Sequence, residues 1–356
     1  MSSKTKNVLV VGAGPAGVSA AYFLRKLDKE ERFSVDLVER LSNGKYQRYH
    51  DMCGEGVSSQ LFVDIKPLKP KGLEERIHLV REYWPGDVSI ESKMDGYIIN
   101  RSCFLESIID EFVSEGGSYQ IGNVNLISQR RDYIKVKINN GFKKYDYVVA
   151  ADGPNSLIRN SLGLAARSKL FFQYVVKKEP DSGVLKFYYD EKYHGDYLWE
   201  FPHEDNVKIG FPADASVKPV IKDDILLKQS KYICYGGIER YVSGNILLVG
   251  DAAGQTNVLT KGGIRNAMNA GRLAAESIIQ DNPLLYEYRW RGSPFSNQIF
   301  SQAFSILKGM SNNDLEKHVE PLRGGYNMLS YFKSLLFYRE YRALYKAYML
   351  SNKFGW

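Results

Sequence analysis

The sequence contains few cysteines, and they are far apart. Its 356 residues include only Cys53, Cys103 and Cys234, and no two of them form a C-x-x-C pair. This spacing argues against a disulfide scaffold and fits a reducing cytosol. We predict no metal site.

Long apolar runs are also missing. No stretch reaches the ~18 apolar residues that a membrane-spanning helix needs. The chain starts with polar residues that lead directly into a predicted strand, so no signal peptide is expected. There is no internal repeat or low-complexity segment. We therefore expect a cytoplasmic protein, either free or peripheral on the inner face of the membrane.

The chain also lacks nucleic-acid signatures. It has a net charge of +7 and a pI of about 9.0, yet it contains no zinc-finger spacing, RNA-binding signature or basic block. We therefore expect no nucleic-acid partner. The positive charge is compatible with simple solubility, with an anionic cofactor or with an anionic membrane surface.

The composition is otherwise that of a globular protein, with an excess of aromatic residues. The length suits two interleaved domains, and 44% of the residues are hydrophobic. Aromatic residues make up 13%, including 25 tyrosines. Such an excess serves general packing, and it also suits a pocket for a large apolar substrate.

The first motif lies at the start of the chain. An apolar strand from Val8 leads into a turn with Gly12, Gly14 and Gly17, which match G-x-G-x-x-G before a predicted helix over 16–29. A second strand, 34–39, ends at Glu39, close to the roughly 20-residue spacing at which a carboxylate binds a ribose hydroxyl. The motif predicts a bound adenine dinucleotide but does not distinguish NAD from FAD.

Two later segments place an acid at the end of a buried strand. Residues 145–151 form a predicted strand before Asp152-Gly153, and Ile246–Val249 form another before Gly250-Asp251. Small residues follow Asp251, and Lys261-Gly262-Gly263-Ile264 opens a predicted helix that runs to about residue 280. Because free helix N–H groups favour anions, this segment suits a phosphate, a ribityl chain and an electron-rich ring edge.

The region between these motifs is predicted to be mostly β. Strands are expected near 77–80, 97–99, 124–127, 134–138, 171–177, 184–189, 197–201 and 207–211, with a hairpin turn at Asn139-Asn140-Gly141. A helix over 103–115 is expected, with Ser102 as its N-cap. Residues 217–244 are interpreted as connecting structure. Tyr197, Trp199 and Phe201 share one strand face, as sheet core or as the wall of a cleft.

The C-terminal region is predicted to be helical. A helix over 331–350 would align Phe337, Tyr341, Leu344 and Tyr348 on one stripe. Its basic residues are Lys333, Arg339, Arg342 and Lys346. The helix either caps the core or lies on anionic lipid.

The order of the three motifs resembles the p-hydroxybenzoate-hydroxylase-type FAD fold. Within that fold, Tyr197-Leu-Trp-Glu-Phe-Pro202 resembles the YxWxFP motif of geranylgeranyl reductases, including archaeal digeranylgeranylglycerophospholipid reductases. Cys53-Gly-Glu-Gly56, Arg101 and the Gly250 and Gly262 segments are also similar. The resemblance covers roughly residues 6–280, and Val258 replaces the proline usual in the family, which implies a less rigid loop.

The resemblance implies an α/β fold: a Rossmann-like FAD-binding domain (GR2 type), an inserted antiparallel substrate sheet and a helical C-terminal region. The expected FAD-binding parts are 1–76, 101–165 and 241–282; the substrate parts are 77–100 and 166–240; the helical region is 283–356. The expected cofactor-binding residues are Gly12, Gly14, Ala16, Gly17, Glu39, Arg40, Cys53, Gly54, Arg101, Val124, Asp152, Gly153, Asp251, Gly262, Gly263 and Ile264.

The implied activity is the reduction of C=C bonds in geranylgeranyl chains of isoprenoid lipids or of their diphosphate precursors. The candidate catalytic residues are Tyr197, Trp199 and Cys53, and the candidate substrate-binding residues are Tyr197, Trp199, Phe201 and Pro202. Proton donors left open are the flavin itself, Cys53, His50 and Tyr197. An external electron donor, NADPH or a ferredoxin-type protein, is expected. The alternatives are a flavin monooxygenase or halogenase, and a non-catalytic isoprenoid carrier.

Overall fold

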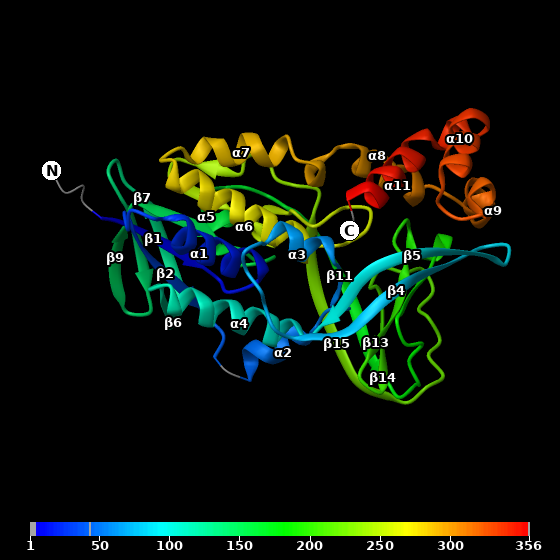
Figure 1. Ribbon diagram of the computed structural model, residues 1–356, viewed down its shortest axis with the longest axis horizontal. Coiled ribbons are helices and arrows are strands. Elements are labelled where there is room, and N and C mark those ends of the chain that lie inside the picture. Colours follow the sequence, from blue (N-terminus) through cyan, green and yellow to red (C-terminus); the bar gives the residue numbers. More distant parts are fainter. Residues whose placement is uncertain (1–4, 43, 355–356) are drawn as a thin grey trace.

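The structure is a computed structural model that describes residues 5–42 and 44–354. The protein is elongated. A parallel sheet with its helices forms one end, and a larger sheet forms the other (Figure 1). The helices that follow residue 298 lie over the far end of the larger sheet. In the part of the chain that is described, no helix is both long and apolar enough to cross a membrane.

The smaller domain is built on a six-stranded sheet in the order β16-β17-β10-β1-β2-β6. All its neighbouring strands pair in parallel except β16 and β17. The carboxyl ends of β1, β2, β10 and β17 therefore meet at one edge, where open α/β sheets bind ligands. The strands are β1 (Lys6–Val11), β2 (Phe33–Glu39), β6 (Ser118–Ile121), β10 (Tyr147–Ala150), β16 (Val242–Ser243) and β17 (Ile246–Leu248).

Three long helices accompany this sheet: α1 (Pro15–Leu27), α4 (Arg101–Ser114) and α6 (Ile264–Ile279). Helices α1 and α6 are very close, because a β-carbon at Gly271 would stand 2.2 Å from the carbonyl oxygen of Ala16. The Ser19 hydroxyl also donates to the Met268 carbonyl at 2.6 Å. This contact fixes the start of α6 beside the start of α1, so both helix N-termini face the same edge of the sheet.

The larger domain is an eight-stranded sheet in the order β15-β11-β14-β13-β12-β4-β5-β3. Its neighbours are antiparallel except β12 and β4, which pair in parallel and join the two separate substrate segments. Strand β4 begins at Leu73, four residues before the boundary expected at 77. The strands are β3 (Gly56–Ser58), β4 (Leu73–Trp84), β5 (Val88–Ile99), β11 (Arg167–Val176), β12 (Val184–Tyr188), β13 (Leu198–His203), β14 (Asn206–Pro212) and β15 (Ile225–Tyr235).

The remaining elements are short or C-terminal. A three-stranded sheet turns at Asn139-Asn140, as predicted; its strands are β7 (Val124–Gln129), β8 (Ile134–Ile138) and β9 (Gly141–Tyr145). The short helices are α2 (Lys45–Asp51), α3 (Gln60–Asp64), α5 (Leu157–Ser161), η1 (Glu191–Tyr193), η2 (Gly250–Ala253), η3 (Pro294–Ser296), η4 (Glu320–Leu322) and η5 (Arg339–Tyr341). The C-terminal helices are α7 (Pro283–Arg291), α8 (Ile299–Lys308), α9 (Asn312–Val319), α10 (Met328–Phe337) and α11 (Arg342–Phe354).

Two local predictions were wrong. Residues 217–244 are not only connecting structure, because β15 lies within them. It is the edge strand of the larger sheet, and its exposed positions and lysines hide the alternation that identifies a strand. The N-cap of α4 is Asn100, whose side chain accepts from the Cys103 amide at 3.0 Å; the Ser102 hydroxyl donates to that same side chain.

The predicted helix over 331–350 is interrupted. Helix α10 ends at Phe337, and Tyr338 leaves the helical conformation at φ −118° and ψ 59° before η5 and α11. The break separates the predicted stripe: Tyr341 and Leu344 are buried in the helical core, whereas Phe337 is 69% exposed. The stripe as a whole therefore does not cap the core.

Candidate active site

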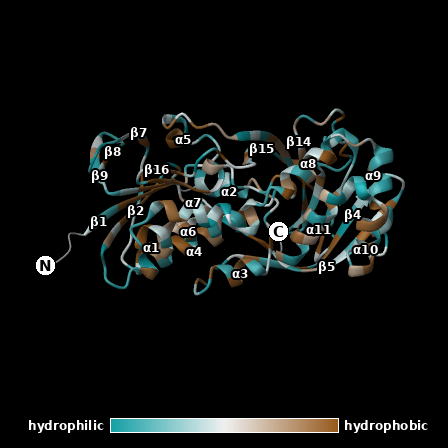
Figure 2. Ribbon diagram, turned by 90° about the horizontal axis from the view of Figure 1, so that it is seen from above, coloured by the Kyte–Doolittle hydropathy of each residue, from teal (hydrophilic) through white to brown (hydrophobic). Residues whose placement is uncertain are grey.

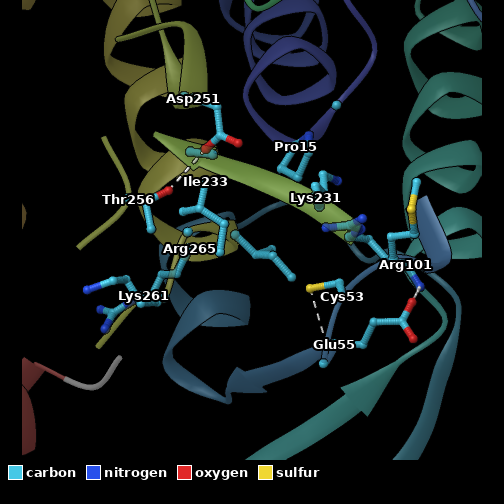
Figure 3. A pocket seen from close by; sticks show the side chains of 18 of the residues that line it. Pro15, Cys53, Glu55, Arg101, Lys231, Ile233, Asp251, Thr256, Lys261 and Arg265 are labelled. Atoms are coloured by element: carbon cyan, nitrogen blue, oxygen red, sulfur yellow. Dashed lines mark hydrogen bonds between the residues drawn. The ribbon is translucent and has the colours of Figure 1, made fainter. Parts of the chain in front are cut away.

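A large cavity runs along the edge where the carboxyl ends of the parallel strands meet, and it extends under the larger sheet. Its volume is about 810 Å³. Figure 3 shows Cys53, Arg101, Lys231 and Asp251, which come from four different segments, arranged around the same space. The cavity therefore joins the nucleotide-type half of the molecule to the substrate-type half.

The glycine turn after β1 has room for a ligand at one position only. Gly12 has φ +95°, and a β-carbon there would stand 2.4 Å from the Ala151 carbonyl oxygen. A β-carbon at Gly17 would stand 1.8 Å from the Gly12 carbonyl oxygen, so this glycine serves packing of helix on strand. At Gly14 the nearest atom would be 3.9 Å away, on His50. The backbone at Gly14 is therefore open to the cavity, as a pyrophosphate would require.

Glu39 ends β2 at the wall of the cavity. Its side chain is buried and its two carboxylate oxygens accept from the backbone amides of Ala13 and Leu41, at 2.7 and 2.8 Å. These bonds use one lone pair of each oxygen and fix the orientation of the carboxylate. The remaining acceptor capacity faces the cavity, where a ribose hydroxyl would meet it.

Two cations share the middle of the cavity. Arg101 is buried, donates its backbone amide to Glu55 at 2.9 Å, and leaves its Nε without a partner among the described residues. Lys231, on β15, places its ammonium 4.0 Å from the centre of the Tyr49 ring. Burial and the neighbouring Arg101 lower the pKa of Lys231 to about 7. The pair forms a site for an anion.

The two strand-terminal acids also face this space. Asp152 accepts from the Ile158 amide through one oxygen, and its other oxygen has no described partner. Asp251 accepts from the Thr256 hydroxyl at 3.0 Å. Burial raises the pKa of both carboxyls. A polyhydroxyl chain between them would satisfy the free acceptors.

The loop that carries Cys53 is held by one buried lysine from β14. The ammonium of Lys208 lies 2.8 Å from Asp51 and 2.5 Å from Glu55, so it binds the loop on both sides of Cys53. His203 lies near the two carboxylates, but Lys208 supplies the positive charge that such a cluster requires. The Glu55 amide donates to the Cys53 sulfur at 3.3 Å.

The second half of the cavity has aromatic walls. Tyr197 and Trp199 have ring centres 6.3 Å apart, and the Tyr197 hydroxyl donates to the Thr260 carbonyl oxygen. Trp199 lies on Gly210, where a β-carbon would stand 1.8 Å from the indole. The other aromatic residues of this wall are Phe171, Phe187, Tyr189 and Phe201. Together they enclose a compartment suited to an apolar chain.

A carboxyl group lies at the far end of this compartment. Glu82 accepts hydrogen bonds from the Tyr326 hydroxyl and, at 3.3 Å, from the Trp84 indole. Burial raises the pKa of Glu82 to about 7, against the opposing effect of these bonds. Tyr348 also lines this end.

Most of the predicted site residues line this one cavity. All the predicted cofactor-binding residues do so except Gly17, which packs beneath the turn, and Tyr197, Trp199 and Phe201 form part of the aromatic wall. Pro202 is buried but is not part of the lining, because alternation along β13 directs it to the opposite face. Lys231, Lys208 and Glu82 also belong to the site, and the sequence carries no local signal for them.

The comparisons with known proteins agree with this geometry. Residues 10–43 match the NAD(P)-binding Rossmann-like domain. The chain is 25% identical to the digeranylgeranylglycerophospholipid reductase of Methanococcus vannielii, covering 93% of this chain and 98% of that protein. It is 30% identical to the digeranylgeranylglycerophospholipid reductase 2 of Methanosphaera stadtmanae, covering 76% and 78% of the two chains.

Solved structures show the same fold. A geranylgeranyl bacteriochlorophyll reductase-like protein from Thermoplasma acidophilum superposes with a TM-score of 0.78 at 20% identity, over 98% of both chains. The flavin-dependent halogenase CmlS superposes with a TM-score of 0.70 at 15% identity, over 90% of this chain and 71% of that one. The predicted fold class is confirmed. The extent of the sequence match, joined to a cavity with an aromatic wall from the Tyr197–Pro202 motif, shows that this chain belongs to the digeranylgeranylglycerophospholipid reductase family.

Proposed function

We propose that this protein is an FAD-dependent reductase that saturates C=C bonds in the geranylgeranyl chains of isoprenoid lipids. The observation that carries the proposal is the continuity of the cavity. The glycine turn, Arg101 and Asp251 line one half, and the aromatic wall around Trp199 lines the other. A redox ring at their junction would present one face to an apolar chain.

The residues of the first half fit FAD. The open backbone at Gly14, the unpartnered Nε of Arg101 and the free oxygen of Asp152 match a pyrophosphate and a polyhydroxyl chain. Glu39 would bind the adenosine ribose. When bound and reduced, the flavin supplies a hydride, and saturation of each double bond then needs one proton in addition.

Three side chains of the cavity are candidates for the proton donor. The Tyr197 hydroxyl already donates to Thr260, and burial raises the pKa of Tyr197. Burial holds the pKa of His50 well below its usual range, so this imidazole is neutral and a poor acid. The Cys53 sulfur accepts one hydrogen bond, from Glu55, which leaves its S–H free to point into the cavity. Of these three side chains we assign the proton to Cys53, and the flavin itself is the remaining candidate.

The electron-rich faces of Tyr197 and Trp199 have a separate role. Protonation of an isolated alkene creates cationic character at its more substituted carbon. Aromatic faces attract such a charge in a desolvated site. The contact of Trp199 with Gly210 and the hydrogen bond of Tyr197 hold both rings in place.

The test is an anaerobic half-reaction. Flavin-loaded protein is reduced with dithionite and mixed with a digeranylgeranyl glycerophospholipid in detergent. We expect reoxidation of the flavin together with a gain of about two mass units for each double bond saturated. A reduced flavin that stays reduced in the presence of the lipid would refute the reductase activity.

A flavin monooxygenase or halogenase is the second candidate, because CmlS shares the fold. Such an enzyme would consume O2 together with NADPH, so coupled oxygen uptake would favour it. An isoprenoid carrier would bind the lipid without any flavin reoxidation. The anaerobic half-reaction, together with an aerobic measurement of oxygen uptake, distinguishes the three functions.

The remaining assignments belong to the same proposal. An external donor, either NADPH or a ferredoxin-type protein, would reduce the flavin. The three cysteines are free thiols in the structure, in keeping with a cytoplasmic enzyme that meets its lipid at the inner face of the membrane. We keep the expected division into FAD-binding and substrate segments as part of this proposal, with β3 and the start of β4, which lie within 1–76, assigned to the larger sheet.

A further inference from the structure

Helix α10 exposes an unusual number of large apolar side chains. Their exposed fractions range from 42% to 79%. They are Met328, Leu329, Phe332, Leu336 and Phe337. The helix is correspondingly coloured mostly hydrophobic in Figure 2. A contiguous apolar surface of this kind marks an interaction site.

The helix differs from an ordinary surface helix, although Tyr331 and the partly buried Leu335 pack against the helical core. Its buried side carries Ser330, Tyr331 and Ser334, and the Ser334 hydroxyl donates to the Ser330 carbonyl at 2.7 Å. Amphipathic helices of globular proteins place apolar residues inward and polar residues outward. The exposed side of α10 therefore has the composition expected for contact with an apolar medium.

Four basic side chains lie on α10 or on the segment that follows it. Lys333 is exposed on the helix itself, and Lys346 is exposed on α11. The guanidinium groups of Arg339 and Arg342 lie at the end of α10, where they donate to the carbonyls of Leu336 and Leu335 at 3.4 and 3.2 Å. None of these four cations forms an ion pair within the described residues.

Within the segment 320–346, the two acidic residues are neutralised. Glu340 pairs with Lys317 at 2.9 Å, and Glu320 pairs with Arg323 at 2.7 Å. The charge left around the apolar face is therefore positive. An apolar face within a basic rim fits the surface of an anionic bilayer, where the side chains enter the acyl region and the cations meet phosphates.

The face is also close to the cavity. Tyr326, two residues before α10, lines the far end of the cavity, and its ring lies 6.1 Å from that of Tyr331 in α10. The α11 residues Tyr348, Ser351 and Asn352 line the cavity as well, and the Asn352 amide donates to the Tyr331 hydroxyl at 2.7 Å. A lipid that leaves a bilayer at α10 would therefore meet the apolar compartment directly.

We infer that the exposed face of α10, with Lys333, Arg339, Arg342 and Lys346, docks the enzyme on an anionic lipid bilayer and places the cavity at its surface. The inference rests on the proposed function for the identity of the lipid that enters. The docking itself depends only on the surface.

The experiment is flotation of the flavin-loaded protein with vesicles. One set contains phosphatidylcholine alone, and the other contains equal parts of phosphatidylcholine and phosphatidylglycerol. We expect flotation with the second set and its loss in high salt, because the Debye length shortens. The double variant Phe332→Asp/Phe337→Asp should bind at least about tenfold more weakly.

A matched control lies on α7. Leu284 and Tyr288 are 68% and 76% exposed, so Leu284→Asp/Tyr288→Asp removes comparable apolar surface elsewhere. This variant should float like the wild type. Equal flotation of the wild type and the α10 variant would overturn the inference. The inference would also be overturned if the wild type is a dimer that binds no vesicles and the α10 variant is a monomer. The α10 face would then be a protein interface.

The same samples separate this inference from the proposed function. Flavin content and reoxidation by detergent-solubilised lipid should be unchanged in the α10 variant, since α10 lies outside the flavin half of the site. Normal flotation without lipid-dependent reoxidation would refute the reductase activity and leave the docking intact. Normal reoxidation without flotation of the wild type would refute the docking and leave the reductase activity intact.

Discussion

The α-carbon of Gly54 lies against the ring of Phe201. A β-carbon at this glycine would stand 2.7 Å from Phe201 Cδ2 and 3.2 Å from Trp199 Nε1. The loop that carries Cys53 is therefore in direct contact with the aromatic wall. The position of the thiol and the shape of the apolar compartment depend on each other.

Replacement of Gly54 by alanine should disturb this contact. The added methyl group would push Phe201 and Trp199 back, because distances below 3.0 Å are not tolerated. We expect kcat/KM for lipid reduction to fall at least about tenfold, while flavin affinity changes little. Gly141→Ala is the control, since its β-carbon would meet only the Ile138 carbonyl oxygen, at 3.8 Å. Equal activity of both variants would contradict the prediction.

Replacement of Arg101 by methionine should weaken flavin binding. The change keeps the apolar stem and the backbone bond to Glu55 but removes a buried guanidinium with an unpartnered Nε. A hydrogen bond to a charged group contributes about 1.5–3 kcal/mol, so the Kd for FAD should rise at least tenfold in a fluorescence titration. Arg76→Met, at an exposed position, should leave the Kd unchanged.

Lys231 should make flavin binding depend on pH. Its pKa is about 7 in the free protein, so it is largely neutral above that pH. An anionic cofactor favours the charged form and raises the pKa, so binding above pH 7 takes up about one proton and affinity falls as pH rises. Calorimetry in buffers with different ionisation heats measures this uptake. Lys231→Met should bind more weakly at pH 6 and show no such uptake; persistent uptake in that variant would assign it to another group.

Replacement of Cys53 by alanine should remove the proposed proton donor. General acids typically contribute 10²–10⁴-fold, so lipid-dependent reoxidation of the flavin should slow by about that factor. The flavin spectrum and affinity should stay close to those of the wild type. Cys103→Ala is the control, since Cys103 is exposed and lies outside the cavity. A reoxidation rate within a few fold of the wild type would exclude Cys53 as the donor.

Glu82 should make stability depend on pH in a defined direction. Its pKa rises from 4.5 in the unfolded chain to about 7 in the folded protein. Between these values the folded state binds more protons than the unfolded state, so stability falls from pH 4.5 to 7 and is level above pH 7. Glu82→Gln removes this loss. The unfolding free energy of the variant minus that of the wild type should therefore be up to roughly 3 kcal/mol larger at pH 8 than at pH 4. Denaturant unfolding at both pH values tests it, with the exposed Glu74→Gln as the control.

The sequence predicted the parts of the fold that are local in the chain. The strand before Gly12, the turn and the helix follow within a few residues, and the same is true of Gly250, Asp251 and the start of α6. Each such segment contains its own strand, turn and helix signals. The alternation of Tyr197, Trp199 and Phe201 likewise identified one face of β13 and of the residue that precedes it.

The features that were missed depend on contacts between distant residues. β15 is an edge strand whose hydrogen bonds to β11 cannot be read from its own alternation. The parallel pairing of β12 with β4 brings together segments about a hundred residues apart, and Lys231 is an ordinary surface-type lysine until Arg101 and Tyr49 lie beside it. The orientation of α10 depends on the break at Tyr338, for which the sequence carries no proline or glycine signal.

The single ammonium of Lys208 has a consequence for protein engineering. It holds Asp51 and Glu55, although these residues precede it by some 150 positions. A chimera whose imported substrate sheet lacks a lysine at this position would leave both carboxylates without a positive partner and would release the loop that holds Cys53. The 51–55 loop and the strand that carries Lys208 therefore depend on each other, and recombination libraries should exchange them together.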